Sequence, residues 1–268
     1  MEQLTSRRAL LAGAAGSAVV LPVIASSRAY GSPDAPDGSD AFPAQDPAMV
    51  REMVGASHAK PDRVRELLRE APRLANASWD WGFGDWESAL GAASHVGNPE
   101  IAGMLLAAGA RANLFTHAML GNIDVVRATI VAMPGIERVR GPHGLTLAHH
   151  ARQGEASAVI EYLKTLPGAD IPYTNLPLTP EQQQPYLGVY RYGEAPTQTF
   201  EVLVQKSTGS LGIQRNGRSL QKLFHQGNHV FHPPGSEETR LTFTVESGKA
   251  TRLQIKGPGS PLLLIRAD

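Results

Sequence analysis

Histidine has the widest chemical repertoire of the side chains in this sequence, because imidazole titrates near neutral pH and also binds metal ions. The chain has nine histidines, and one group of them could perform acid–base or metal chemistry if the fold brings its members together. That group is His95, His117, His143, His149 and His150. We expect structural roles for these side chains, while polar contacts with a partner and metal binding remain the alternatives.

A second group of histidines lies near the C-terminus, at His225, His229 and His232. Side chains along a strand alternate between two faces, so His229 and His232 should point to opposite sides of a sheet. A tetrahedral metal site needs three or four convergent ligands, and this spacing does not supply them. We therefore predict no metal site here.

The sequence lacks the familiar catalytic motifs. It contains no Gly-x-Ser-x-Gly nucleophile, no His-Glu-x-x-His pair, no phosphate-binding loop and no dinucleotide fingerprint. The absence of cysteine removes thiol nucleophiles, thiolate metal sites and disulfides. We expect a protein that is not an enzyme and has no catalytic residues and no cofactor. The enzymatic alternative is a site built from the histidines in a cleft between two domains.

The charge of the chain excludes one class of partner. Lys and Arg total 25, Asp and Glu also total 25, and the two signs are interspersed. A nucleic-acid-binding protein normally carries a basic patch or stripe. We therefore expect neither a nucleic-acid partner nor a polybasic membrane patch.

All three tryptophans lie in residues 79–86, which we call the tryptophan segment. Tryptophan is enriched at binding hot spots, and Gly82 and Gly84 would let the segment adapt to a protein partner. The alternative is that the rings fold back to fill the protein's own structure. The predicted binding residues of this segment are Trp79, Asp80, Trp81, Phe83, Asp85 and Trp86.

Short helices would position these residues. Residues 88–113 predict two of them, with Ser88 as the N-cap of the first helix and Gly97 in the turn that follows. Gly109 stands where a left-handed C-terminal cap of the second helix is needed. This stretch resembles one ankyrin repeat. One such unit cannot bury its apolar face alone, so similar units should flank it.

Related units do flank it, with turn residues before the segments KPDRVRELL, NIDVVRATI and EASAVIEYL at Ala59, Gly121 and Gly154. The resemblance to ankyrin repeats covers residues 46–170 and implies a solenoid of about four repeats at 47–172. It implies a concave binding face on which His95 and His117 approach each other, and we predict both as binding residues. It also implies that His149 forms a structural hydrogen bond between neighbouring repeats.

The N-terminus indicates where the protein works. The run Thr5-Ser6-Arg7-Arg8-Ala9-Leu10-Leu11 resembles a twin-arginine export motif, and an apolar run to Ile24 follows it. We predict a signal peptide at residues 1–29, cleaved after Ala25 or Ala29, and a disordered linker at 30–46. The mature protein would be periplasmic or secreted, with no membrane contact after cleavage.

From residue 177 to 268 the helical spacing gives way to strand alternation. Eight short strands are predicted, at residues 187–192, 199–205, 210–214, 219–224, 229–232, 240–245, 250–255 and 262–265. Turn residues separate them, and Asn216-Gly217 is the sharpest hairpin signal. This regular spacing predicts an antiparallel meander that is closed or nearly closed into a small barrel.

The start of this region, from Leu178-Thr179-Pro180-Glu181 through Tyr186-Leu187-Gly188-Val189-Tyr190, carries a second resemblance. It resembles the small lipocalin-like β domain at the C-terminus of many exported bacterial hydrolases. Such a domain accompanies a catalytic partner, and its interior could hold an apolar small molecule. An interior filled by Leu203, Phe224, Phe243 and Leu253 would argue against a bound ligand.

The sequence thus predicts an α+β protein in two domains, an α-solenoid of ankyrin repeats followed by an antiparallel all-β barrel-like domain. We expect an exported recognition or scaffold protein that binds an unidentified exported protein through the concave face and the tryptophan segment. One alternative is a small-molecule carrier or hydrolase accessory that uses the barrel. Another is an enzyme with its site at the interdomain cleft.

Overall fold

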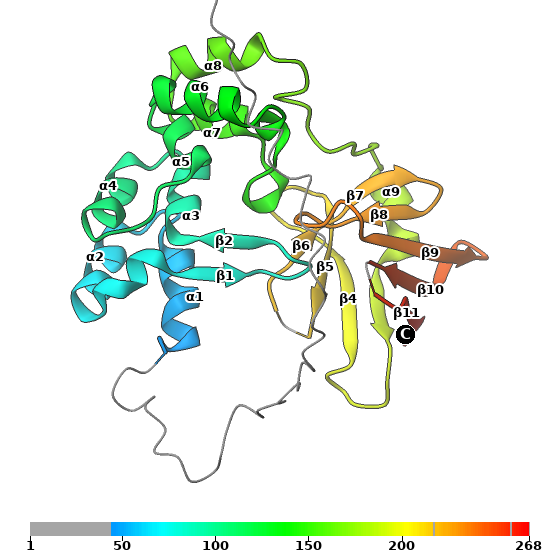
Figure 1. Cartoon of the computed structure of the whole chain (residues 1–268). Coiled ribbons are helices and arrows are strands. Elements are labelled where there is room, and N and C mark those ends of the chain that lie inside the picture. The colour runs from blue at the N-terminus through cyan, green and yellow to red at the C-terminus, as the bar shows by residue number, and fades with distance from the viewer. Residues whose placement is uncertain (1–43, 217, 258, 268) are drawn as a thin grey trace, which may run out of the picture. The chain divides into compact units, whose positions relative to one another are not determined.

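The computed structural model describes residues 44–216, 218–257 and 259–267. The predicted signal peptide at 1–29 and most of the predicted linker lie outside these residues. Short helices come first along the chain and a β-sheet follows (Figure 1). Residues 45–268 form one compact unit. None of the helices in the described part of the chain is long and apolar enough to cross a membrane.

Eight α-helices of the described chain lie in the region before residue 165, and polar N-caps start several of them. The helices are α1 (Pro47–Ala56), α2 (Pro61–Glu70), α3 (Ala89–His95), α4 (Pro99–Ala107), α5 (Leu114–Met119), α6 (Ile123–Ala132), α7 (Leu147–Gln153) and α8 (Ser157–Lys164). The predicted cap of α3 is confirmed, since Ser88 Oγ accepts a hydrogen bond from the Gly91 N–H at 2.9 Å. Asn98, Asn113 and Thr146 cap α4, α5 and α7 in the same way.

The predicted ankyrin solenoid is wrong. The helices are at most ten residues long and form no evident solenoid. An ankyrin array repeats one helix-pair unit, whereas the connections here differ in kind. A 3-10 helix η2 (Pro72–Asn76) and a two-stranded hairpin join α2 to α3, while η3 (Ile136–Arg138) and η4 (Pro142–Gly144) join α6 to α7. Helical spacing predicts each helix pair, but the regular stacking of pairs depends on contacts far apart in the sequence.

Two apolar clusters hold the helices together. Side chains from α1 to α4, including Met53, Leu67 and Leu105, form the first cluster and are fully buried. Val126 and Val159 belong to the second cluster, which lies under α5 to α8. Polar side chains that follow α1, end α3 and precede α7 lie close to one another.

The tryptophan segment is part of a hairpin formed by β1 (Ser78–Asp80) and β2 (Trp86–Ser88). The hairpin extends from the helices to the sheet (Figure 1). Three contacts join it to the sheet: Gln221 Nε2 donates to the Trp81 carbonyl at 3.1 Å, the Phe83 ring lies 6.0 Å from the Phe200 ring, and Gly235 packs on the Asp85 backbone. Helices and sheet therefore meet at this hairpin.

The sheet is a nearly closed antiparallel barrel, as the sequence predicts, but it has nine strands. They are β3 (Gly188–Arg191), β4 (Thr199–Val204), β5 (Leu211–Arg215), β6 (Gln221–Lys222), β7 (Phe224–Gly227), β8 (Val230–His232), β9 (Arg240–Glu246), β10 (Lys249–Lys256) and β11 (Leu262–Arg266). Their order in the sheet is β6-β5-β4-β3-β11-β10-β9-β8-β7. The predicted strand at 219–224 is divided between two strands, because β6 ends at Lys222 and β7 begins at Phe224. The short α9 (Pro180–Gln183) and η5 (Gln184–Tyr186) precede the barrel.

Aromatic and aliphatic side chains pack the inside of the barrel. Phe243 and Leu253 lie in this core with Tyr190 and Phe231, while Leu203 and Phe224 are only partly buried. An apolar ligand in the interior would have to displace these packed side chains.

Candidate metal centre

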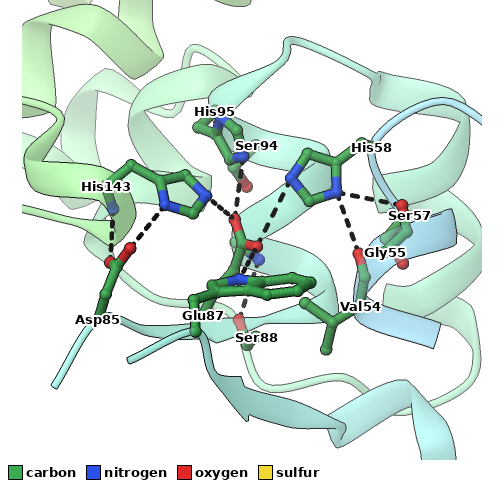
Figure 2. A network of polar contacts seen from close by, with 12 residues as sticks. Val54, Gly55, Ser57, His58, Asp85, Glu87, Ser88, Ser94, His95 and His143 are labelled. Carbon is green, nitrogen blue, oxygen red and sulfur yellow. Dashed lines mark hydrogen bonds and ion pairs between the residues drawn. The ribbon is translucent and has the colours of Figure 1, made fainter. Parts of the chain in front are cut away.

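Three histidines and one glutamate from four separate segments converge on one point. His58 follows α1, Glu87 lies in β2, His95 is the last residue of α3, and His143 lies in η4. Each residue offers one ligand atom, and these atoms all lie within 4.8 Å of one another. Figure 2 shows the three imidazoles arranged around the Glu87 carboxylate. Among the described residues this is the one group of three or more metal-ligating side chains.

The distances within the group match the size of a metal site. Glu87 Oε1 lies 2.9 Å from His95 Nε2 and 3.4 Å from His143 Nε2, and Glu87 Oε2 lies 3.5 Å from His58 Nε2. Ligands of a tetrahedral ion with bonds of about 2.1 Å are separated by about 3.4 Å. An ion could therefore be bound with only small side-chain movements.

Two of these atoms are close but not hydrogen-bonded. Glu87 Oε1 and His95 Nε2 are buried, and neither has a hydrogen-bond partner, although 2.9 Å separates them. If His95 is protonated, this contact is an ion pair. If His95 is neutral, a metal ion bound between the two atoms would give both of them a partner, as buried polar atoms usually have.

The outer nitrogens of two imidazoles are already held by the protein. His143 Nδ1 lies 2.8 Å from Asp85 Oδ2, on the side away from Glu87 (Figure 2). His58 Nδ1 lies 3.2 Å from the Val54 carbonyl oxygen at the end of α1. Metal-binding histidines almost always have such partners, which select the tautomer and turn the other nitrogen to the ion. The carboxylate is oriented in turn, because Trp81 Nε1 donates to Glu87 Oε2 at 2.8 Å.

The backbone of His143 is adapted to this position. Its φ is 58°, a left-handed conformation that is uncommon for a residue with a side chain. The His143 N–H donates to Asp85 Oδ1 at 2.7 Å, which holds the strained turn in place. Strain of this kind is concentrated at functional sites. The conformation directs Nδ1 toward Asp85 and Nε2 toward Glu87.

The charges of the group favour a cation. Asp85 and Glu87 are both 1% exposed. Burial opposes charge on Glu87, but its contacts with His143 and His95 outweigh this effect and hold the pKa of Glu87 well below its usual range. Burial lowers the pKa of His143, but its hydrogen bond to Asp85 and its close contact with the Glu87 carboxylate outweigh burial and raise that pKa to about 10. A protonated His143 balances one buried carboxylate, whereas a divalent ion would balance both with neutral imidazoles.

Two further histidines surround the group without joining it. His149 Nε2 lies 3.0 Å from the His95 carbonyl oxygen, so it contacts α3 from α7, but not between two ankyrin repeats as expected. The His150 side chain is fully buried, neither ring nitrogen has a hydrogen-bond partner, and the ring lies 4.9 Å from the Phe115 ring. Burial lowers the pKa of His150 to about 3, so this imidazole is neutral.

A cavity of about 980 Å³ adjoins the group, between the helices and the barrel. His58 and His143 line it, and their side chains are 29% and 32% exposed. The Glu87 side chain is fully buried behind them. An ion at the centre of the group would therefore face the cavity on the side of His58 and His143.

The residues predicted as a binding surface have different positions. Trp79 and Trp81 pack on the core under α1 to α4, Phe83 packs on the barrel core, and Trp86 is 63% exposed. Asp80 accepts a hydrogen bond from the Gly82 N–H at 2.8 Å. The structure brings Asp85, His95 and His143 together at the centre described above.

The structure does not bring His117 into the metal-ligating group with His95, as was expected. His117 Nδ1 lies 3.1 Å from Asn122 Nδ2, and the imidazoles nearest to His95 are those of His58 and His143, at 4.9 and 5.1 Å between ring centroids. The second histidine group also forms no cluster. His229 contacts the Tyr186 hydroxyl, and His232 contacts the Pro233 carbonyl oxygen.

Sequence reasoning missed His58 and Glu87. Neither belongs to a short motif, because the four ligands come from segments that only the folded chain brings together. The available signal was weak: a glutamate directly after the tryptophan segment and an isolated histidine after a predicted helix. No model of a known protein family matches the chain, and no curated protein matches it either.

Proposed function

We propose that this protein is a metal-dependent enzyme, with a divalent transition-metal ion held by His58, Glu87, His95 and His143. One observation carries the proposal: four ligand atoms lie within 4.8 Å of one another, and two of them are buried without hydrogen-bond partners. Three imidazoles and one carboxylate suit Zn²⁺ and the neighbouring ions Fe²⁺, Co²⁺ and Ni²⁺. This proposal replaces the expectation of a protein without cofactor or catalytic role.

The cavity supports an enzymatic role over a structural one. Structural zinc sites are closed by four protein ligands, whereas catalytic sites keep a coordination position open. With four protein ligands here, the open position would be a fifth one, on the side of the ion that faces the cavity. Here His58 and His143 line a cavity of about 980 Å³, which lies in the size range of small-molecule sites. An ion with an open position would act as a Lewis acid on a molecule in that cavity. Of the three functions considered from the sequence, an enzyme with its site between the helices and the barrel has the strongest geometric support.

The first experiment measures metal content. The full chain, purified without chelator and dialysed against Zn²⁺, should retain one equivalent by inductively coupled plasma mass spectrometry. Glu87→Gln keeps the size of the side chain but removes its charge, and it should lose the metal, as should His95→Ala. His117→Ala is the matched control, because His117 lies outside the group. Equal metal content in wild type and Glu87→Gln would refute the proposed centre.

The second experiment asks whether the ion has an open position. Co²⁺ substituted at the centre should give visible absorption bands, and added azide should shift them if a small anion reaches the ion. Bands that are insensitive to azide would indicate a closed, structural site. That result would remove the enzymatic part of the proposal and leave the metal centre.

A second candidate function is recognition of a protein partner, favoured by the exposure of the large Trp86 side chain, at 63%. Such a contact would use the outer face of the hairpin and not a concave solenoid surface. A pull-down from periplasmic extract should then lose its partner when Trp86→Ala replaces the wild type. If wild type and Trp86→Ala recover the same proteins, that result would count against a binding role of Trp86.

We also retain export as a proposal, based on the twin-arginine pattern at Arg7 and Arg8. Replacement of both residues by lysine should leave the protein in the cytoplasmic fraction. Unchanged fractionation would contradict this route.

A further inference from the structure

We propose that the cavity beside the metal centre binds an organic anion, a small molecule with a carboxylate on an apolar body. This inference rests on the proposed metal centre and specifies its substrate class. The carboxylate would pair with Lys222, and the body would extend toward His58 and His143, where the ion is exposed to the cavity.

Lys222 supplies a positive charge to the cavity wall. Its side chain lines the cavity, and its Nζ lies 4.9 Å from the centre of the Phe224 ring, which lines it as well. Among the described residues no carboxylate lies within 4.0 Å of this ammonium group. A lysine next to an apolar ring and without a counter-ion is well placed to bind an anion.

The other charges of the cavity compensate one another. Arg152 contacts both oxygens of Asp170, at 2.5 and 3.1 Å, so this pair adds no net charge to the wall. A divalent ion at the centre would be balanced by Glu87 and by Asp85 behind His143. The charge of Lys222 then remains, and the cavity has a net positive charge that favours an anionic ligand.

Apolar and aromatic side chains form one part of the remaining wall, beside several polar ones. Trp81, Tyr173 and Phe224 line the cavity together with Leu145 and Leu220. Tyr173 is fixed in place, because its ring lies 4.9 Å from Phe224 and the Arg140 guanidinium stacks on it at 4.2 Å. Aromatic and apolar side chains of this kind typically contact the apolar parts of small molecules, while the polar side chains that also line the cavity can orient them.

Strand β6 connects Lys222 to the metal centre. The neighbouring Gln221 donates to the Trp81 carbonyl oxygen at 3.1 Å, and the Trp81 indole donates to the Glu87 carboxylate at 2.8 Å. These two hydrogen bonds keep the strand of Lys222 against the hairpin that supplies a metal ligand. Lys222 therefore lines the same cavity as His58 and His143.

The test uses the full chain loaded with Zn²⁺ and two probes of equal size, 3-phenylpropionate and its uncharged amide. Calorimetric titration should show tighter binding of the carboxylate. Lys222→Met keeps the apolar part of the side chain and should weaken carboxylate binding about tenfold or more, with little effect on the amide. Lys256→Met is the control, because Lys256 is an exposed barrel lysine that does not line the cavity.

Metal content is measured in the same samples, so two failures are distinguishable. If the protein holds Zn²⁺ but does not bind 3-phenylpropionate, or binds it equally well in Lys222→Met, the anion site is refuted and the metal centre stands. If no variant or wild-type sample holds metal, the proposed function fails and the inference that rests on it fails too. Loss of carboxylate binding in Lys222→Met alone, with metal retained, supports the proposal.

Discussion

Asp85 contacts His143 twice: Oδ1 accepts the backbone N–H at 2.7 Å, and Oδ2 lies 2.8 Å from Nδ1 of the ring. A carboxylate behind a metal-binding imidazole orients the ring and makes it a stronger ligand. Asp85→Asn keeps an oxygen for the backbone contact but removes the charge. We expect Zn²⁺ affinity to fall by about 10- to 100-fold, measured by competition with a fluorescent zinc indicator.

Asp80→Asn is the control for this variant. Asp80 lies in the same hairpin and accepts a hydrogen bond from the Gly82 N–H, but it has no contact with the metal-ligating group. Its substitution should leave Zn²⁺ affinity unchanged. Equal affinities in Asp85→Asn and wild type would mean that Asp85 does not act through the ligand.

Metal binding should also stabilise the fold, because the ligands come from α1, the hairpin, α3 and η4 and converge only in the native state. Free Zn²⁺ at about 100 times its dissociation constant would add about 2.7 kcal/mol to the free energy of unfolding. For a chain of this size that is a rise in Tm of roughly 5–10 °C. Differential scanning fluorimetry with Zn²⁺ and with excess EDTA should show this difference in wild type. Glu87→Gln should show the same Tm in both buffers; a zinc-dependent rise in that variant would place the stabilising ion elsewhere.

Gly235 allows the barrel to approach the hairpin. Its φ is +82°, and a Cβ there would lie 2.6 Å from the backbone nitrogen and Cα of Asp85. Gly235→Ala should therefore destabilise the protein and displace the residue that supports His143. Gly248 is a matched control, with φ +79° and no atom within 4 Å of an added Cβ. Gly235→Ala should cost at least about 1 kcal/mol more than Gly248→Ala in urea unfolding, and it alone should weaken Zn²⁺ binding.

The sequence predicted local elements well, since their signals lie within a few residues. Ser88 caps α3 as expected, and the alternating segments after residue 177 form the antiparallel barrel. The ankyrin assignment failed because a capped helix pair has the same local pattern in a solenoid and in an irregular helical layer. The break at Leu223 between β6 and β7 was also missed, because no glycine or proline marks it.

The site was harder to predict than the fold. Asp85 and His95 were expected to contact a partner, whereas Asp85 supports His143 and His95 contacts Glu87. Their roles depend on which segments meet, and this is decided by the hairpin between the helices and the barrel. Ligands that come from four separate segments have no fixed spacing in the sequence, so a single sequence does not reveal them as a group.

The burial of His150 leads to a prediction about the stability of the metal-free protein in acid. The fully buried imidazole has a pKa lowered to about 3, by burial first and then by the nearby His95, His149 and His143, while Glu87 acts in the opposite direction. In the unfolded chain its pKa is about 6.5. Below that pH the unfolded state takes up a proton that the folded state does not, so stability falls as the pH falls toward 3.

This proton uptake gives a slope of up to about 1.4 kcal/mol per pH unit for His150 alone. Urea unfolding in EDTA at pH 6, 5 and 4 should therefore show a steeper loss of stability in wild type than in His150→Leu, which keeps a buried side chain but cannot titrate. The difference between the two slopes is the contribution of His150, because His143, Glu87 and the other histidines are present in both proteins. Leu147→Met is the control for a change in the buried face of the same helix that removes no titratable group, and its slope should match that of wild type. Parallel slopes in wild type and His150→Leu would mean that the folded protein protonates His150 without cost.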